Sequence, residues 1–341
     1  MFRVLIIIHF LILLNKIKDI KVALIGCGAV AEQFHLPALK KIKANVSCCI
    51  DLDINRAIHL ANKLKSNPIT DYDACINDFN VAIISLPHNL HANISIDLLK
   101  KGKHVLVEKP MAISVEECDE MIVASKKYNK ILAIGNFRRN YDNTAWLKKN
   151  LNGSYLRDVE EFYFKDGGVY SWPVTTDSFW NMQKSGGGVL IDTGAHTIDQ
   201  LLYLLGDASV LEYKDDSFGG PEADCIFKLK MNEGSIGTVE LSRTSDIGSE
   251  AYIKTSKHEI TMGLTNHSLE ISNYDSLNVN NKLPSFKSQS YLSLFSSQLF
   301  NWFDGIINGG NQYVSGEEAK KTIEIINSCY LNREKLIKPW L

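Results

Sequence analysis

The chain has 341 residues, enough for two domains with substantial cores. Its formal net charge of −2 gives no electrostatic reason to expect a nucleic acid or an anionic membrane as a partner. The seven cysteines are an odd number without a C-x-x-C pair or the spacing of Cys and His metal ligands, which favours reduced thiols in the cytoplasm over disulfides or structural zinc.

An apolar extension, residues 1–20, precedes the first recognisable motif. Its apolar run, residues 4–14, has eleven residues and is too short to span a bilayer. The run has the composition of a signal-peptide core, but no small-x-small cleavage site follows it. We expect an extension that packs on the protein or a start codon assigned too early. In either case we expect the first 18 residues to be dispensable for catalysis.

A strand, a glycine-rich turn and a helix open the first domain. Residues 22–26 predict a short buried strand, Gly26, Gly28 and Ala31 have the G-x-G-x-x-A spacing, and residues 29–43 have a helical pattern. Gly26 allows a tight turn, Gly28 lets a pyrophosphate approach the backbone, and Ala31 lets the helix pack on the strand. The helix then presents free N–H groups to the phosphates. This order predicts a dinucleotide-binding site.

The acid expected in such a site follows on the second strand, residues 46–52. Asp51 lies 23 residues after the second glycine of the motif, close to the spacing at which a carboxylate accepts the ribose hydroxyls. A carboxylate there repels the 2′-phosphate of NADP and favours NAD. Arg56 is an alternative phosphate ligand, which we interpret instead as a solvated helix residue. In the preceding helix we interpret His35 as a surface or packing residue and Pro37 as the site of a kink.

Strands and helices keep alternating through the first part of the chain. The expected elements are a helix over 56–66, a short element within 70–77, a strand over 81–85, a helix over 90–101 that ends at Gly102, a strand over 104–107, a helix from Ser114, and a strand over 131–135. This alternation predicts one doubly wound parallel sheet over residues 21–138. Residues 86–89 follow a strand at its carboxyl end, where ligands bind in such sheets.

Residues 139–341 have a different rhythm, with a boundary near 136–143. We expect strands over 156–165, 223–231, 235–242, 250–256, 258–262 and 268–272, helices over 189–205, 291–307 and 316–331, and a loop over 273–287. Short turns join several of the strands, so we predict an α+β domain with a large, mostly antiparallel open sheet. Such a sheet offers a flat face through which the chain could form a homodimer or homotetramer.

Four segments resemble, in order, the signatures of the glucose–fructose oxidoreductase and inositol dehydrogenase (Gfo/Idh/MocA) family. They are GCGAVAEQFH, SLPHNLH, GKHVLVEKPMA and SGGGVLIDTGAHTIDQLLYLLG. The resemblance covers nearly everything from residue 21 to 331 and leaves residues 1–20 outside. It implies an NAD(P)-dependent enzyme that oxidises or reduces a hydroxyl or carbonyl group on a sugar, a cyclitol or a nucleotide sugar.

The resemblance also implies a set of cofactor contacts at the ends of the parallel strands. We expect them at Gly26, Gly28, Ala29, Val30, Asp51, Ser85, Pro87, His88, His91, Glu108 and Lys109. The expected cofactor is NAD, with NADP as the second choice.

Lys109 follows a parallel strand and stands between Glu108 and Pro110. Elsewhere in the chain a lysine after a strand would be a surface residue. The resemblance implies that this E-K-P segment is a rigid turn that aims the lysine at the substrate hydroxyl. A partly desolvated lysine beside the cofactor can then exchange a proton.

Asp192 and His196 are four residues apart in a helical pattern, which places them on one face. An isolated D-x-x-x-H would be a helix N-terminal acid and a packed histidine. After the triple glycine 186–188, which can let the backbone approach a substrate, we expect both to be catalytic and to bind substrate together with Lys109. Asp199 could orient the His196 ring or face solvent. No third ligand is evident, so we expect no metal.

Aromatic and basic residues near the boundary are candidates for the sugar pocket, although aromatic residues in a strand-rich domain are often core. These candidates are Arg139, Tyr170, Trp172 and Trp180.

Two other functions stay open. A glycosidase that uses bound NAD for transient oxidation and elimination would produce no net NADH. A cofactor-binding regulator would bind NAD without turnover, and the presence of Lys109, Asp192 and His196 argues against it.

Overall fold

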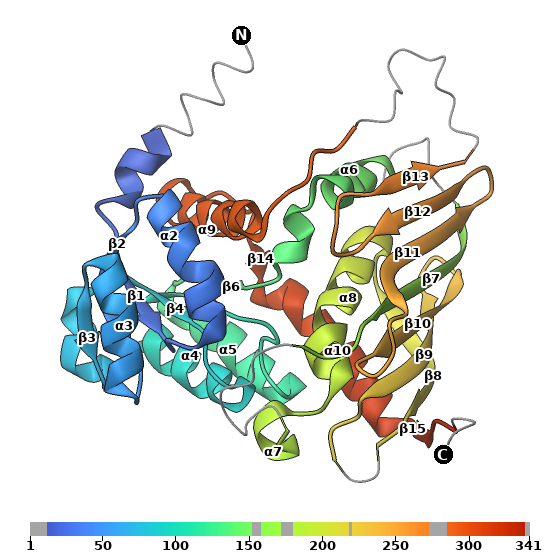
Figure 1. Cartoon of the computed structure of the whole chain (residues 1–341), viewed down its shortest axis with the longest axis horizontal. Helices are drawn as coiled ribbons and strands as arrows, with labels where there is room; N and C mark the ends of the chain where they lie inside the picture. Colours follow the sequence, from blue (N-terminus) through green and yellow to red (C-terminus); the bar gives the residue numbers. More distant parts are fainter. Residues whose placement is uncertain (1–11, 152–157, 172–179, 218–219, 273–284, 338–341) are drawn as a thin grey trace. The chain divides into compact units, whose positions relative to one another are not determined.

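The computed structural model describes residues 12–151, 158–171, 180–217, 220–272 and 285–337. The chain divides into two units, shown in Figure 1. The first unit consists of Met1–Gly135 and Ser290–Lys320, and the second of Asn136–Gln289 and Lys321–Leu341.

A seven-stranded sheet forms the centre of the first unit. Its strands are β1 (Lys21–Ile25), β2 (Asn45–Ile50), β3 (Asn67–Ile69), β4 (Val81–Ile84), β5 (His104–Val107), β6 (Leu132–Ile134) and β14 (Val314–Ser315). The spatial order is β14-β6-β5-β4-β1-β2-β3, and every pair is parallel except β14 with β6. The predicted doubly wound parallel sheet is confirmed, with its order reversing between β1 and β4.

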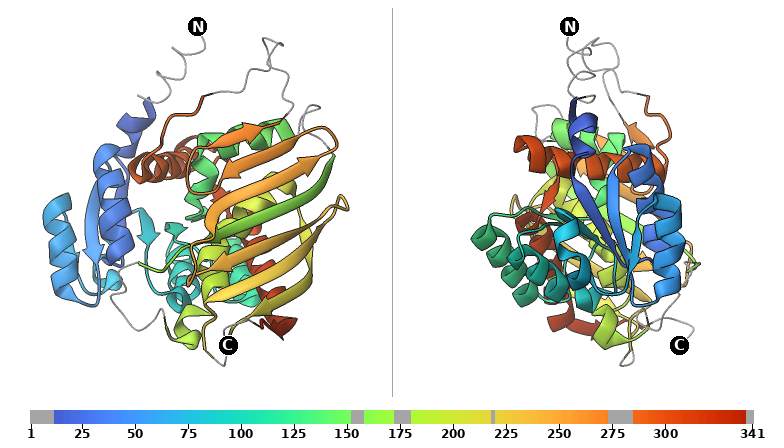
Figure 2. Two further views of the ribbon diagram at one scale, coloured as in Figure 1. Left: turned by 45° about the vertical axis from the view of Figure 1, so that its right-hand side comes forward. Right: turned by 90° about the vertical axis from the view of Figure 1, so that its left-hand side faces the viewer.

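Helices cover this sheet on both sides. The helices of this unit are η1 (Ala31–His35), α2 (Leu36–Lys41), α3 (Ile54–Leu64), η2 (Tyr72–Asp78), η3 (His88–Leu90), α4 (His91–Lys100), α5 (Val115–Tyr128) and α9 (Tyr291–Asn308), and α9 packs on α2 and η1. Helices α2 and α3 lie on one side and α4 and α5 on the other (Figure 2). Two predicted ends are confirmed by geometry. The Ser114 hydroxyl caps α5 by accepting from Glu117 N, and Gly102 after α4 has φ +79°.

The helix after the glycine turn is continuous but changes its winding. Residues 31–35 form a π-helical turn, and Pro37 then lies in the first turn of α2. Proline lacks an N–H group, and the first turn of a helix is where that group has no intrahelical partner. The expected kink is therefore a change of winding at His35, whose side chain is fully buried.

Part of the N-terminal extension packs into the first unit. Residues 12–17 are helical, the side chains of Leu13 and Ile17 are fully buried, and Lys16 Nζ donates to Asn308 Oδ1 at 3.4 Å. Removing the first 18 residues would therefore remove core side chains, which argues against our expectation that they are dispensable. The rest of the apolar run, residues 4–11, lies outside the described residues. Among the described helices, none is long and apolar enough to cross a membrane.

An eight-stranded sheet forms the second unit, confirming the predicted, mostly antiparallel sheet. Its strands are β7 (Val159–Gly167), β8 (Ala208–Asp215), β9 (Asp224–Met231), β10 (Ile236–Ser242), β11 (Gly248–Thr255), β12 (Glu259–Gly263), β13 (Leu269–Ile271) and β15 (Arg333–Lys335). The order is β13-β12-β11-β7-β10-β9-β8-β15. The pairs β7 with β10 and β8 with β15 are parallel, and the others are antiparallel.

Helices pack on one face of this sheet. Helix α8 (Val189–Leu205) lies against the strands, and α6 (Asp142–Leu151) and η4 (Phe137–Asn140) pack on α8 (Figure 1). The short helix α7 (Met182–Ser185) precedes α8 in the chain. Helix α10 (Gly316–Leu331) begins in the first unit and ends in the second. Strands β8 and β15 and helix α6 were not anticipated, and most of the expected loop 273–287 lies outside the described residues.

Candidate functional site

The carboxyl ends of β1 and β4 meet where the order of the first sheet reverses, the place where open α/β sheets bind ligands. Gly26 has φ +89°, and a Cβ there would lie 2.0 Å from Ser85 O, so this glycine lets the two loops touch. At Gly28 a Cβ would meet no atom within 4 Å. The glycine turn therefore has open space on the side where the sequence places the pyrophosphate.

Asp51 follows β2 at the same edge and is half-buried. Its Oδ2 accepts from Cys27 N at 2.8 Å, and its Oδ1 accepts from Asp53 N at 2.9 Å. One carboxylate thus fixes the glycine turn and the start of α3, and each oxygen keeps a second lone pair for a ribose hydroxyl. Arg56 pairs with Asp53, with 3.6 Å between Nε and Oδ2.

These features fit a dinucleotide. The helix that starts at Ala29 and Val30 has N–H groups in its first turn without intrahelical partners, and both residues are half-exposed. Asp51 supplies a carboxylate one strand away. Ser85, Pro87 and His88 are likewise half-exposed in the loop after β4.

The E-K-P turn follows β5, next to that loop. Glu108 N donates to Ile84 O at 2.9 Å, and the Glu108 side chain lies in the core with Oε1 2.7 Å from His35 Nε2. Lys109 is half-exposed between two buried neighbours. His91 is fully buried, with its ring nitrogens on two backbone carbonyls. Both ring nitrogens contact the protein itself, and the cofactor contact expected of His91 stays a prediction.

Helix α8 in the second unit carries the other predicted catalytic residues. Most of its side chains are buried, but Asp192, Thr193, His196, Tyr203 and Leu205 are half-exposed. Their spacing puts Asp192 and His196 on one stripe of the helix. The rings of Phe137 and His196 pack in a T-shaped arrangement, with the centroids 5.2 Å apart.

Asp192 forms an ion pair that the sequence gave no reason to expect. Arg243 Nη2 donates to Asp192 Oδ2 at 2.9 Å and to Gly188 O at 3.2 Å. The guanidinium also lies over the Tyr170 ring, 5.3 Å from its centroid, and the Trp180 ring packs edge-on against Tyr170. The structure thus brings Asp192 together with two of the predicted pocket residues. Burial and the nearby Asp192 charge raise the pKa of Tyr170.

Arg139, a basic candidate for the sugar pocket, forms hydrogen bonds inside the second unit. Its Nε and Nη2 donate to Asp199 Oδ2 and Oδ1 at 2.9 and 2.7 Å, and Asp199 is 1% exposed. The guanidinium also lies over the ring of Tyr203. Arg139 is thus held against α8, and its guanidinium group is a partner of the Asp199 carboxylate. Trp172 lies outside the described residues.

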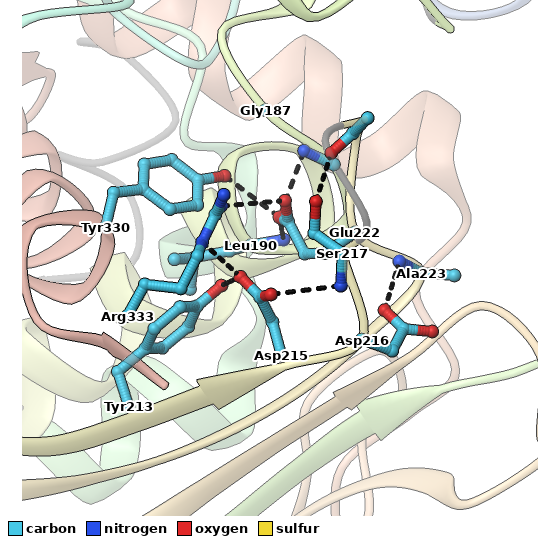
Figure 3. A network of polar contacts seen from close by, with 12 residues as sticks. Gly187, Leu190, Tyr213, Asp215, Asp216, Ser217, Glu222, Ala223, Tyr330 and Arg333 are labelled. Atoms are coloured by element: carbon cyan, nitrogen blue, oxygen red, sulfur yellow. Dashed lines mark hydrogen bonds and ion pairs between the residues drawn. The ribbon is translucent and has the colours of Figure 1, made fainter. Parts of the chain in front are cut away.

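A buried polar network holds the start of α8, as Figure 3 shows. Glu222 Oε1 accepts from Gly188 N and Leu190 N, both at 3.0 Å, and from the Tyr330 hydroxyl at 2.9 Å. Arg333 Nη2 lies 3.7 Å from Glu222 Oε2, and its Nε pairs with Asp215 at 2.7 Å. Glu222 is therefore the carboxylate that caps α8, supplied from another part of the chain. Burial raises its pKa.

The triple glycine before α8 is explained by the same network. A Cβ on Gly187 would lie 1.9 Å from the Tyr330 hydroxyl oxygen, and one on Gly188 would lie 1.9 Å from Glu222 O. We expected these glycines to let the backbone approach a substrate. In the structure, the groups that approach closely belong to the protein itself.

The part of the chain that the structure describes holds no group of three or more His, Cys, Asp or Glu side chains placed to bind a metal ion. The seven cysteines, all of them in this part, are buried and form no disulfide.

Comparison with protein families gives two matches. Residues 20–136 match the model of an oxidoreductase family with an NAD-binding Rossmann fold (GFO_IDH_MocA). Residues 169–335 match the C-terminal alpha/beta domain of the same family.

The individual relatives match this chain over only part of their length. D-glucoside 3-dehydrogenase of Escherichia coli is 29% identical over 59% of this chain and 58% of its own length. Levoglucosan dehydrogenase of Pseudarthrobacter phenanthrenivorans is 30% identical over 51% of this chain and 47% of its own. The chain thus spans about half the length of these curated relatives. The WlbA dehydrogenase structure from Chromobacterium violaceum, in complex with NADH and UDP-GlcNAcA, shares the fold, with a TM-score of 0.80, 19% identity and coverage of 92% and 93% of the two chains.

Proposed function

This chain belongs to the Gfo/Idh/MocA oxidoreductase family, and from that premise we propose that it transfers a hydride between NAD and a hydroxyl or carbonyl group of a sugar, a cyclitol or a nucleotide sugar. The observation that carries the proposal is the carboxyl edge of the parallel sheet. There the open glycine turn, the Asp51 carboxylate and half-exposed Lys109 follow strands β1, β2 and β5. Relatives named as dehydrogenases of sugars and inositol support the substrate class.

For the cofactor, we propose NAD rather than NADP. Gly28, Ala29 and Val30 would hold the pyrophosphate, and Asp51 would accept the adenosine ribose hydroxyls. Ser85, Pro87 and His88 would line the next part of the site. Bound NAD supplies the hydride acceptor, and the chain has to orient the substrate and provide a path for the proton.

For the proton, we propose that His196 and Lys109 act jointly. An alcohol that loses a hydride must also lose its hydroxyl proton, so a base is needed within hydrogen-bond reach of that oxygen. We assign proton acceptance to His196 and polarisation of the oxygen to Lys109, and the two roles could be exchanged. Both side chains are half-exposed, each in its own unit.

For the substrate, we propose that Asp192 accepts hydrogen bonds from a neighbouring hydroxyl. The Arg243 guanidinium beside it supports this role, because the ion pair fixes the position of the carboxyl group, whose oxygens accept hydrogen bonds. Trp180, 57% exposed and packed on Tyr170, and Trp172 would offer apolar faces to a sugar ring.

We further propose a cytoplasmic homodimer or homotetramer formed through the eight-stranded sheet. Cysteine side chains kept as buried thiols are typical of a reducing compartment. On the sheet, Tyr252, Tyr163 and Thr238 lie in one register across three strands and are half-exposed, and tyrosine is enriched in interfaces. Light scattering on the purified chain tests this, and a monomer at micromolar concentration would contradict it.

A substrate screen tests the function. Free and nucleotide-linked sugars and cyclitols are offered with NAD, and NADH absorbance is followed. We expect net NADH with at least one class of sugar. Product release without net NADH would instead support the NAD-dependent glycosidase, and NAD binding without any turnover would support the regulator.

A further inference from the structure

Two buried histidines hold the turn that contains Lys109, one on each side. His35, the last residue of the π-helical turn, has Nε2 2.7 Å from Glu108 Oε1. His91, the first residue of α4, has Nδ1 2.7 Å from Pro110 O. Both histidines are fully buried.

On the first side, Glu108 has little freedom. The rings of His35 and Phe295 of α9 pack in a T-shaped arrangement with centroids 5.2 Å apart, and this contact restricts the imidazole. A Cβ on Gly135 would lie 2.8 Å from Glu108 Oε2, so the carboxyl group occupies space that only glycine leaves at the end of β6. The carboxyl group of the residue before Lys109 is thus held away from solvent.

On the second side, His91 links two loops. Its Nε2 lies 2.9 Å from Leu86 O, in the loop that follows β4, while its Nδ1 contacts Pro110 O. Burial lowers the pKa of His91, so the neutral ring carries a single N–H, which we assign to Nδ1 because its contact with Pro110 O is the shorter one. The imidazole therefore sets the separation between the loop after β4 and the E-K-P turn after β5.

We propose that His35 and His91 are positioning residues that together orient Lys109 toward the substrate oxygen. The proposal rests on the proposed function, since it gives Lys109 a task. A lysine side chain has four rotatable bonds, so its ammonium group returns to one place only if its backbone is fixed on both sides. Displacing a reacting group by about 1 Å can lower a rate roughly 10²-fold.

Amide side chains separate the two contacts of His91. Asn places its amide nitrogen near the position of Nδ1, and Gln places it near Nε2. His91→Asn therefore keeps a donor for Pro110 O, whereas His91→Gln offers a donor to Leu86 O and releases the E-K-P turn. On the other side, His35→Gln keeps a donor for Glu108 and His35→Ala does not. His104→Gln is the matched control, because His104 Nδ1 accepts from Ile131 N at the other end of β5.

Two readouts are measured on each full-length variant. The first is kcat with the best sugar. The second is the rate at which trace acetic anhydride labels Lys109 in the protein without NAD, quantified by peptide mass spectrometry against the exposed Lys149. We expect His91→Gln and His35→Ala to lower kcat roughly 10²-fold and to change the rate at which Lys109 is labelled. The variants His91→Asn, His35→Gln and His104→Gln should stay close to wild type in kcat and in the labelling rate.

Equal labelling of Lys109 in the two His91 variants, or wild-type labelling in both His91→Gln and His35→Ala, would overturn the proposal. If His35→Ala does not fold, the two His91 variants decide. If no sugar is turned over by the wild type, the proposed function fails, and the labelling comparison still decides whether the histidines position Lys109.

Discussion

Arg243 and Asp192 form a nearly buried ion pair at the start of α8, with Nη2 and Oδ2 2.9 Å apart and side chains 7% and 20% exposed. The same guanidinium contacts Gly188 O, so one side chain holds both the turn before the helix and the acid in its first turn. The proposed substrate role of Asp192 therefore depends on a residue 51 positions away in the sequence.

Replacing Arg243 by Gln should lower kcat/KM for the sugar roughly 10²-fold, because Asp192 loses the donor that fixes its carboxylate. The dissociation constant of NAD should stay within about threefold, because Arg243 belongs to the other unit. Steady-state kinetics and calorimetric titration measure the two effects. Lys321→Gln, which removes an exposed pair with Asp207, is the control and should be silent. A similar loss in both variants would contradict a specific role for Arg243.

Asp51 should set the preference for NAD. Asp51→Asn removes the charge but keeps an oxygen for the N–H of Cys27 or Asp53, whereas Asp51→Ala also removes the hydrogen bonds that hold the glycine turn. We expect Asp51→Asn to weaken NAD binding and to reduce the ratio of the NADP and NAD dissociation constants by about tenfold. A tenfold change in this ratio corresponds to about 1.4 kcal/mol, which we assign to the lost charge on the carboxylate. A wild type that binds NADP more tightly than NAD would refute the assignment.

Much of the fold follows from local patterns. The apolar run at β5, the Ser114 cap and the long periodic stretch of α8 each carry their signal within a few residues, and the structure has them where the sequence predicts them. Strand β3 gave no such signal, because it has three residues with Pro68 in the middle, which only an edge strand tolerates. The short β15 depends on pairing with the distant β8.

In the candidate site, too, local patterns predict single elements but not the contacts between distant residues. The spacing of Asp192 and His196 predicts a shared helix face, and their half-exposed positions agree. The sequence could not show that Arg139 pairs with Asp199, that Arg243 pairs with Asp192, or that Glu222 caps α8. Each of these contacts joins residues more than 30 positions apart, so no local pattern records it.

The second and third glycines of the triple glycine should respond differently to added methyl groups. Gly188→Ala should lower the free energy of unfolding by about 1–3 kcal/mol or more, because the obstacle is the Glu222 backbone. Gly187→Ala should also be destabilising, but Tyr330→Phe removes the oxygen nearest to the new methyl group and should recover part of the loss. Urea unfolding measures all three variants. Full tolerance of Gly188→Ala would show that the turn is not packed as described.

Glu222 should make stability depend on pH. Burial raises its folded-state pKa above the ordinary value near 4.5. Above that pH the unfolded chain has lost a proton that the folded chain still holds, so the folded state binds more protons and its stability falls as pH rises. Glu222→Gln keeps an oxygen for the helix N–H groups and removes this dependence. The free energy of unfolding of the wild type, minus that of Glu222→Gln, should therefore decrease as the pH rises from 5. A difference that stays constant or rises would contradict the raised pKa of Glu222.

The most direct test of the central claim is the initial rate of NADH formation on the best sugar, in His196→Ala, Lys109→Ala and the surface control Lys149→Ala. Loss of general acid–base help lowers rates roughly 10²–10⁴-fold, and we expect a loss of that size in the first two variants with a wild-type rate in the third. NAD affinity should be nearly unchanged in His196→Ala, because His196 lies outside the dinucleotide motif. Near-wild-type rates in both His196→Ala and Lys109→Ala would contradict the proposed catalytic set and leave only cofactor binding.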